Sequence, residues 1–571
     1  MFQSFRHAAT WVHTWFGLVL GFVLIVAFFF GSLSVFDREI DRWAIPTSRF
    51  APQPMPSFDA MLRPVFESIQ PGKESLDQAR KLVDGPLPIH WDNPDFWGAF
   101  TTHRDPVLDM RAAWDTPNAR VPDSVFGSRT IDPRSGKLFP HDQLKIGSEF
   151  FYPLHHNLTL NYDLTPNGRD LGNWIVGFAG LVMLVALISG VVMHRKIFRE
   201  FFTFRPTRNT QRSVLDLHNM TGVLALPFHF FFAFTGLLIF AGTYFPVTDT
   251  QLKPLHELHE KIEEQETGLP HDRSGVTAPL ASVDAMVAEA QRRWTARGMA
   301  GEVGLLSVNH IGDANGYVSV YRAGTDRIAS VSEGIHFKAS TGQILREDPP
   351  QTVMGGIADF LTGLHLQHFR HWPLRWFYVL GGLMGTICIA TGLIFFAEKR
   401  KKQHARTGNQ GSRVVDALAV TTITGMLIAT MTILIANRLL PEALPVGWLP
   451  RGNLEIYLFW AGWALAMLHA FVRSAPVALG KINPAWREQC WAAAIMATLA
   501  VLLNWITTGD HLLRTIGTGY WPVAGVDLSL LTIAAAAAVA ARKLGQRETG
   551  RNNAERAASK PRTVAREAAN V

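Results

Sequence analysis

Two histidines in one apolar stretch are the residues whose type and spacing best suit chemistry. His218 and His229 lie eleven residues apart in DLHNMTGVLALPFHF, a segment otherwise apolar enough to lie in a bilayer. An imidazole is costly in hydrocarbon unless it has a partner, and it is a common axial ligand of haem iron. On a continuous helix, eleven residues rise about 16.5 Å and turn three times plus about 20°, so both rings would lie on one side. This spacing suits two haem groups at two depths of a membrane.

Four other histidines lie where they could complete the two pairs of axial ligands: His13, His155, His194 and His365. For the inner haem, His218 could pair with His13 or His194. For the outer haem, His229 could pair with His155 or His365. The sequence leaves both choices open, because a histidine at the end of a membrane helix is often only an interfacial residue.

The elements that must position these histidines are long apolar helices. Hydrophobic residues make up 48% of the 571 residues and charged residues only 18%, and the apolar residues come in runs long enough to span a bilayer. We expect an α-helical integral membrane protein, in contact with lipid, with about eight transmembrane helices. The runs are residues 11–36, 173–194, 215–244, 374–397, 415–437, 454–472, 489–508 and 520–541.

The distribution of Lys and Arg predicts how these helices are oriented. The loops 195–213 and 398–413 each carry six basic residues, and the tail from Arg542 carries eight. Basic loops face the cytoplasm, so both termini are expected there, and the two long polar segments face the outside. For a bacterium-like chain, this means an inner-membrane protein with two periplasmic segments. Because the basic residues are spread over membrane flanks, the pI of 9.4 gives no indication of nucleic-acid binding.

An internal repeat relates the two halves of the first 400 residues. His13-x-x-x-Gly matches His218-x-x-x-Gly, and a further glycine follows each histidine by eighteen residues, at Gly31 and Gly236. The outside segments end alike, in TIDPRSGKLF and HFKASTGQIL, and each is followed by a histidine-bearing stretch, FFYPLHHNLTL and FLTGLHLQHF. The next helices carry SGVV and TGLI near their cytoplasmic ends. The repeating unit is thus a helix, an outside α+β module, an interfacial histidine segment and a second helix.

The predicted organisation has nine segments. They are helix 1 (1–36), outside module 1 (37–172), helix 2 (173–194), a cytoplasmic loop (195–213), helix 3 (214–245), outside module 2 (246–371), helix 4 (372–397), a four-helix bundle (398–541) and a basic tail (542–571).

The repeating unit, the H-x3-G start and the Ser/Thr-Gly hairpin resemble the PepSY-associated transmembrane family of bacterial inner-membrane proteins. The resemblance covers about residues 5–400, and it implies two periplasmic PepSY-like modules. This family includes haem-containing reductases that deliver electrons to ferric siderophores in the periplasm. The last four helices depart from the smaller members of the family.

The leading hypothesis is therefore an oxidoreductase with two haem b groups that reduces a ferric chelate, such as a ferric siderophore, for iron acquisition. The chain has no P-loop, no G-x-G-x-x-G after a strand and no CxxC, so the electrons would come from quinol or a redox partner. One alternative is a non-redox protein that binds a peptidase or another envelope partner. Another is a metal transporter, which is disfavoured because Asp37 and Asp216 only flank helices and no carboxylate is expected at depth.

Overall fold

The computed structural model describes most of the chain, in two compact units. The described residues are 4–81, 87, 94–101, 105–115, 124–140, 143–161, 171–193, 205, 210–241, 267–299, 301–330, 333–442, 449–478 and 481–559. The first unit comprises residues 1–200 and 221–387, and the second comprises residues 201–220 and 388–571.

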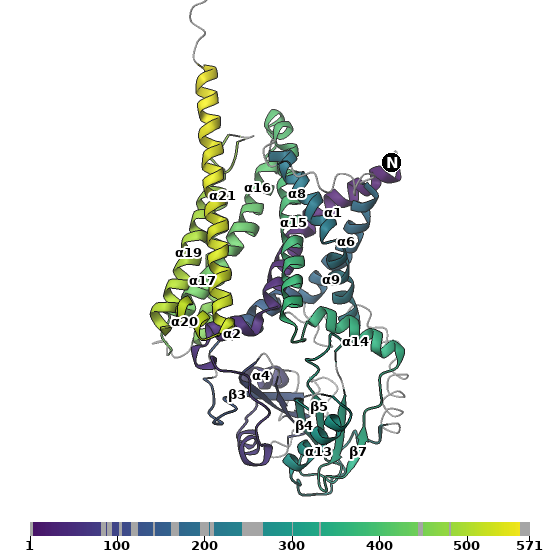
Figure 1. Cartoon of the computed structure of the whole chain (residues 1–571). Coiled ribbons are helices and arrows are strands. Elements are labelled where there is room, and N and C mark those ends of the chain that lie inside the picture. Colours follow the sequence, from purple (N-terminus) through teal and green to yellow (C-terminus); the bar gives the residue numbers. More distant parts are fainter. Residues whose placement is uncertain are drawn as a thin grey trace, which may run out of the picture. The chain divides into compact units, whose positions relative to one another are not determined.

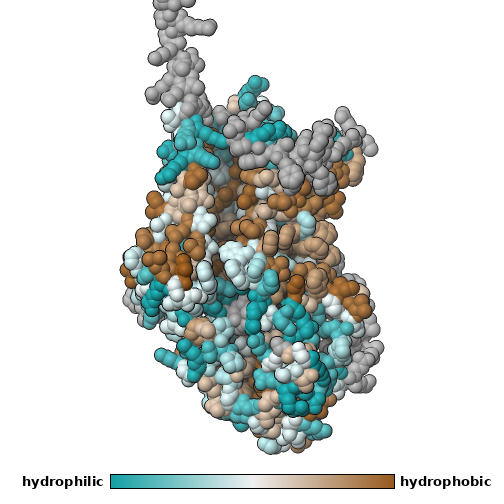
Figure 2. Space-filling view, in the orientation of Figure 1, coloured by the Kyte–Doolittle hydropathy of each residue, from teal (hydrophilic) through white to brown (hydrophobic). Residues whose placement is uncertain are grey.

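Apolar helices dominate both units. Within the described ranges, seven helices are long and apolar enough to cross a membrane, or up to eight if one bent pair forms a single span. On α6 and α9 large apolar side chains such as Phe178, Ile188 and Phe231 are exposed, and Figure 2 shows hydrophobic residues along the helices. A multi-pass helical membrane protein is therefore confirmed. The spanning helices are α1 (Phe5–Ser34), α6 (Leu171–Met193), α15 (Trp372–Thr407), α16 (Gly411–Val420) continued through η4 (Thr421–Gly425) and α17 (Met426–Leu439), α18 (Arg451–Ser474), α19 (Ala485–Thr508) and α21 (Trp521–Ser559).

The third predicted span is broken between its two histidines. Helices α8 (Thr210–Leu224) and α9 (Leu226–Ile239) meet at 64°, with Ala225 between them. Pro227 is in the first turn of α9; it has no N–H to donate, and its ring clashes with a continuous helix. The argument that His218 and His229 lie on one side of a single helix is therefore wrong, and Pro227 was the signal against it.

The two segments predicted to lie outside share one antiparallel sheet. Its order is β3-β2-β1-β4-β5-β6-β7, and the two segments join where Gly98 of β1 pairs with Ser307 of β4 (Figure 1). On each side of this junction the strands follow one another outward in chain order. The strands are β1 (Phe96–Phe100), β2 (Leu108–Asp115), β3 (Ser124–Ile131), β4 (Val303–Asn309), β5 (Tyr317–Arg322), β6 (Gly334–Lys338) and β7 (Ile344–Glu347).

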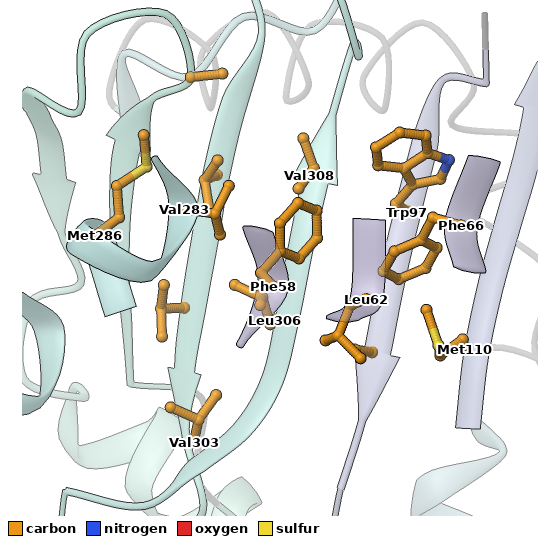
Figure 3. Packing of buried hydrophobic residues seen from close by; sticks show 14 of the residues in the cluster. Phe58, Leu62, Phe66, Trp97, Met110, Val283, Met286, Val303, Leu306 and Val308 are labelled. Atoms are coloured by element: carbon orange, nitrogen blue, oxygen red, sulfur yellow. The ribbon is translucent and has the colours of Figure 1, made fainter. Parts of the chain in front are cut away.

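A single hydrophobic core joins the two halves of the sheet. Strand β2 alternates buried and less buried residues, as a half-covered strand does. Its buried side chains pack with residues from η2 (Phe58–Leu62), α3 (Arg63–Glu67) and α13 (Val283–Ala296), as Figure 3 shows. Phe66 stacks on Trp97 with 5.2 Å between ring centres. Each such buried large side chain contributes about 1.5–3 kcal/mol, which fixes the sheet as one body.

Short helices connect the spans of the first unit to the sheet. They include α2 (Asp37–Ala44), η3 (Ile146–Phe151), α5 (Tyr152–His156) and α14 (Val353–Leu366). Asp41 of α2 accepts hydrogen bonds from the Gly147 amide at 2.7 Å and the Ser148 hydroxyl at 2.6 Å. These bonds fix the start of η3, which runs directly into α5 and its histidines.

The second unit is a helical bundle with a core of small residues. Buried alanines such as Ala429, Ala470 and Ala497 let its helices approach closely. Two carboxylates are nevertheless buried one or two turns inside its spans. Glu455 of α18 accepts a hydrogen bond from Asn437 at 3.1 Å, and Asp527 of α21 accepts one from Asn504 at 3.2 Å. The prediction that the spans carry no carboxylate at depth is therefore wrong for these two residues.

Candidate functional site

His155 of α5 and His365 of α14 face each other in the first unit. Their ring centres are 6.0 Å apart and their planes differ by 25°. A metal–imidazole bond is about 2 Å long, so an iron bound by both rings would hold the ring centres about 6 Å apart once the ring radii are added. The two imidazoles therefore have the separation of a pair of axial ligands.

Hydrogen bonds fix the tautomer of both rings. Nδ1 of His155 lies 2.8 Å from the Ala27 carbonyl oxygen, which can only accept, so this nitrogen carries the proton. Nδ1 of His365 lies 2.9 Å from the Thr235 hydroxyl, which itself donates to the Phe231 carbonyl. The Thr235 oxygen therefore accepts from His365. In both rings, Nε2 keeps the lone pair that a metal requires.

Two glycines make room for these rings. A Cβ on Gly31 would lie 2.6 Å from Nδ1 of His155, and a Cβ on Gly236 would lie 3.0 Å from Cε1 of His365. The first distance is shorter than any real contact, so an alanine at residue 31 would displace the ring. The repeated glycines thus seat the outer histidines, a more specific role than helix packing.

Burial keeps both imidazoles neutral. Loss of solvent lowers the pKa of His155 to about 4 and that of His365 to about 3. A neutral imidazole is the form that binds a metal. At neutral pH, both rings are therefore ready to act as ligands.

Both histidines line a cavity of about 540 Å³ within the first unit. This volume lies in the range of cofactor sites, about 300–1,000 Å³. One part of the wall is apolar, with Leu24, Phe28 and Phe232 and with four further glycines, Gly177, Gly180, Gly236 and Gly382, beside Gly31. The other part carries charged residues: Asp37, Arg38, Asp109, Arg111, Lys145 and Glu149. A flat cofactor with one apolar and one polar edge would match such a wall.

The charged part of the wall is held by ion pairs. Arg38 pairs with Asp105 at 3.2 Å, and Lys145 pairs with Asp109 at 2.6 Å. The acids beside Lys145 raise the pKa of its amine in spite of burial. Burial raises the pKa of Asp41 to about 7, because its charged form loses solvent. Of these groups, Arg38, Asp109 and Lys145 line the same cavity as the histidine pair.

His13 and His218 are anchored in the same manner as His155. Nδ1 of His13 donates to the Ala186 carbonyl at 2.9 Å, and Nδ1 of His218 donates to the Cys388 carbonyl at 2.7 Å. In each case a glycine four residues after the acceptor, Gly190 or Gly392, would place a Cβ 3.3 Å from the ring. Each histidine has this arrangement within its own unit.

His229 lies elsewhere in the first unit. It is buried on α9, where its ring meets Phe28 edge-on with 5.7 Å between centres, and its Nε2 would lie 3.1 Å from a Cβ on Gly385. It is not among the residues that line the cavity. Its pairing with His155 or His365 stays a prediction. His194 lies outside the described residues.

Sequence reasoning did not consider the pair of His155 with His365, nor Thr235 as an anchor. The sequence did contain a pattern at these sites, a Ser or Thr directly before a glycine. Ser189-Gly190, Thr235-Gly236 and Thr391-Gly392 each place a hydroxyl beside the glycine that seats a histidine. The charged residues of the cavity wall carried no such pattern, because they come from separate elements.

These features define a multi-pass helical membrane protein with anchored histidines and a cofactor-sized cavity. The family described as PepSY-associated TM region matches residues 10–399, and the chain belongs to this family. The resemblance drawn from the sequence is thereby confirmed. The chain is also similar to the uncharacterized protein PA4219 of Pseudomonas aeruginosa, with 26% identity over 375 residues that cover 63% of this chain and 87% of that protein. The region that matches the family ends at residue 399, before α16 begins.

Proposed function

We propose that this protein is a haem b oxidoreductase of the bacterial inner membrane that passes electrons across the membrane to a ferric chelate, such as a ferric siderophore. The observation that carries the proposal is the pair of His155 and His365. Their ring centres are 6.0 Å apart beside a 540 Å³ cavity, and both Nδ1 atoms are occupied by hydrogen bonds. This combination fits a bis-histidine haem site.

Each group of residues at the outer site would have a distinct role. His155 and His365 would bind the iron through Nε2, and Gly31 and Gly236 would let the rings sit close to α1 and α9. Arg111, which lines the same cavity, would neutralise an acidic substituent of the haem. When bound, a haem supplies reversible one-electron chemistry at a potential set by its ligands and surroundings.

A second haem, with His218 as one ligand and His13 or His194 as the other, stays the pairing expected from the sequence. Its support is that His13 and His218 are anchored in the same way, each within its own unit: Nδ1 donates to a carbonyl that a glycine follows four residues later. At the outer site, we assign His365 in place of His229 as the partner of His155.

The proposal includes an internal duplication and a periplasmic sheet. The mirrored order of strands about β1 and β4, and the matching contacts of His13 and His218, support two copies of a helix–module–helix unit with PepSY-like modules. The basic loops support cytoplasmic termini. With that orientation, His155 and His365 lie toward the periplasm, where a ferric chelate arrives.

The electron donor must supply one electron for each ferric ion that is reduced. One electron converts a ferric ion to a ferrous ion, and a quinol releases two electrons and two protons, so one quinol would serve two chelates. The second unit offers buried polar groups in spans, Glu455 and Asp527, as acceptors for such protons. A separate redox partner would serve equally at the inner haem.

The test begins with protein purified from haem-replete cells. We expect a red protein with the spectrum of bis-histidine haem b, which dithionite reduces and a ferric siderophore reoxidises. A gallium complex of the same siderophore, which cannot accept an electron, is the control. A colourless protein would refute the haem assignment, and a reduced spectrum unchanged by the ferric complex would refute the substrate.

One observation favours a second function, transport of a metal ion. Glu455 and Asp527 are buried within spans, where carboxylates often mark ion paths. Uptake of zinc or ferrous iron into proteoliposomes, abolished in Asp527→Asn, would support transport. Absence of flux in a haem-replete preparation would leave reduction as the function.

A further inference from the structure

A second cavity of about 130 Å³ lies beside the outer histidine site in the first unit. Three residues, Arg38, Lys145 and Glu149, line both cavities and so form the wall between them. Ser128 and Pro140 also line the smaller cavity and are exposed. The smaller cavity therefore connects the surface of the sheet domain with the wall of the outer site.

Arg42 is the unusual residue of this cavity. It is 5% exposed, and its Nε and Nη2 atoms are buried without a hydrogen-bond acceptor. Arg42 favours the charged form of Asp105 through space, but neither Nε nor Nη2 donates a hydrogen bond to it. Two buried N–H groups of a guanidinium without acceptors cost several kcal/mol, as other unsatisfied buried charged groups do. Such a group is expected to have a partner that is not part of this chain.

The two unsatisfied atoms indicate the chemistry of that partner. Nε and Nη2 form the side of the guanidinium whose two parallel N–H bonds match the two oxygens of a carboxylate. The two cations of the wall between the cavities already have acids: Arg38 pairs with Asp105, and Lys145 pairs with Asp109. Arg129, which also lines the smaller cavity, donates a hydrogen bond to the Ser128 carbonyl. The cavity is thus built to accept one planar oxyanion at Arg42.

The surroundings favour a carboxylate over a phosphate. Three acids, Asp41, Asp105 and Glu149, line the same cavity, and a dianion would be repelled by them more than a single carboxylate. Gln143 Oε1 is also buried there without a partner. A hydroxyl or water beside the carboxylate would satisfy it, and the volume leaves room for such a group at about 30 Å³ per water.

We infer that this cavity is a subsite for one carboxylate group of the ferric chelate, held by the Nε–Nη2 edge of Arg42. The inference rests on the proposed function, because the subsite would hold the chelate next to the wall of the outer haem site. It assigns the substrate class as carboxylate-bearing chelates.

The test uses the haem-loaded protein in detergent and calorimetric titration with citrate. We expect citrate to bind, and Arg42→Gln to weaken its binding at least tenfold. Arg42→Lys keeps the charge but loses the fork, so an intermediate loss is expected. Arg134→Gln is the matched control, since Arg134 pairs with Asp132 at 2.7 Å on the same domain and does not line the cavity. Thermal unfolding of each variant reports folding.

A kinetic comparison tests the link to reduction. Dithionite-reduced protein is mixed with ferric citrate or with ferric tris(acetohydroxamate), which has no carboxylate. Arg42→Gln should raise the ferric citrate concentration needed for half-maximal reoxidation at least tenfold and leave the hydroxamate complex unchanged. An equal effect on both chelates would overturn the subsite.

Haem content, measured in the same samples, separates the possible failures. A protein without haem would refute the proposed function whatever citrate does. Citrate that fails to bind a haem-loaded wild type would overturn the subsite alone. Loss of haem in Arg42→Gln would also overturn the subsite, since the carboxylate held by Arg42 would then belong to the haem. Tighter binding of inorganic phosphate than of citrate would overturn it as well.

Discussion

His155 and His365 of the outer site and the histidines His13 and His218 are all anchored by a hydrogen bond at Nδ1. The two groups differ in what surrounds the rings. His13 lies on α1 and is seated by Gly190 of α6, whereas His155 lies on short α5 and is seated by Gly31 of α1. Helix α1 thus contributes a ring to one site and a seat to the other. In the outer pair the rings also face each other beside a cavity and a charged layer. A hydrogen bond at Nδ1 orients a ring as a ligand, and two rings that face each other can bind one metal ion.

The largest effect should come from removing one ligand of each pair. The double variant His218→Ala with His365→Ala is expected to lose nearly all haem, because each haem keeps only one axial ligand. Each single variant should lose about half. The haem-to-protein ratio from a pyridine haemochrome assay measures this. A double variant that loses no more haem than either single variant would contradict the assignment of His218 and His365 to two separate haem sites.

The glycine seat of His155 offers a sharper test within one helix. Gly31→Ala should abolish the outer haem, about half of the total, because the added Cβ would lie 2.6 Å from Nδ1 of His155. Gly17→Ala on the same helix is the matched control, since a Cβ there meets nothing within 4 Å. Equal haem content in the two variants would show that the seat of His155 is unimportant.

The anchor of His365 should have a smaller effect. Thr235→Val removes the oxygen that accepts from Nδ1, and loss of such an outer partner costs about 10–100-fold in metal affinity. Thr386→Val is the control, because that hydroxyl bonds only to the Gly382 carbonyl of its own helix. Haem transfer to apomyoglobin measures the affinity. Similar transfer rates for Thr235→Val and Thr386→Val would argue against the anchor.

Asp41, which lines the smaller cavity beside the outer site, predicts a modest pH effect. The folded state raises the pKa of Asp41 to about 7. The unfolded value is near 4, so the folded protein holds an extra proton between these values and loses stability as the pH rises from about 4 to about 7. Asp41→Asn should remove this loss, on the order of 1–3 kcal/mol at neutral pH. The melting temperature of both proteins is measured across this pH range. An equal change in melting temperature for the two proteins would contradict the prediction.

The sequence predicted the parts of this comparison that depend on local pattern. Apolar length identified the spans, and the spacing of His13 with Gly31 and of His218 with Gly236 marked the repeated features. The pairing of β1 with β4 joins residues about 200 apart, so no local periodicity reveals that the two segments expected to lie outside share one sheet.

The candidate site was predicted less well, for a physical reason. The helical-wheel argument for His229 required an unbroken helix, and Pro227 breaks it. The contact of His155 with His365 depends on how α5 and α14 pack, which ligand type and spacing alone do not determine. The buried Arg42 was likewise invisible, because only its missing partners single it out.

The central claim is that His155 and His365, rather than His229, bind the outer haem. The most direct measurement is the haem-to-protein ratio of His365→Ala compared with His229→Ala, each purified from haem-replete cells. The account predicts that His365→Ala loses about half of the haem and that His229→Ala keeps nearly all of it. Loss of half the haem in His229→Ala, with none lost in His365→Ala, would contradict the account.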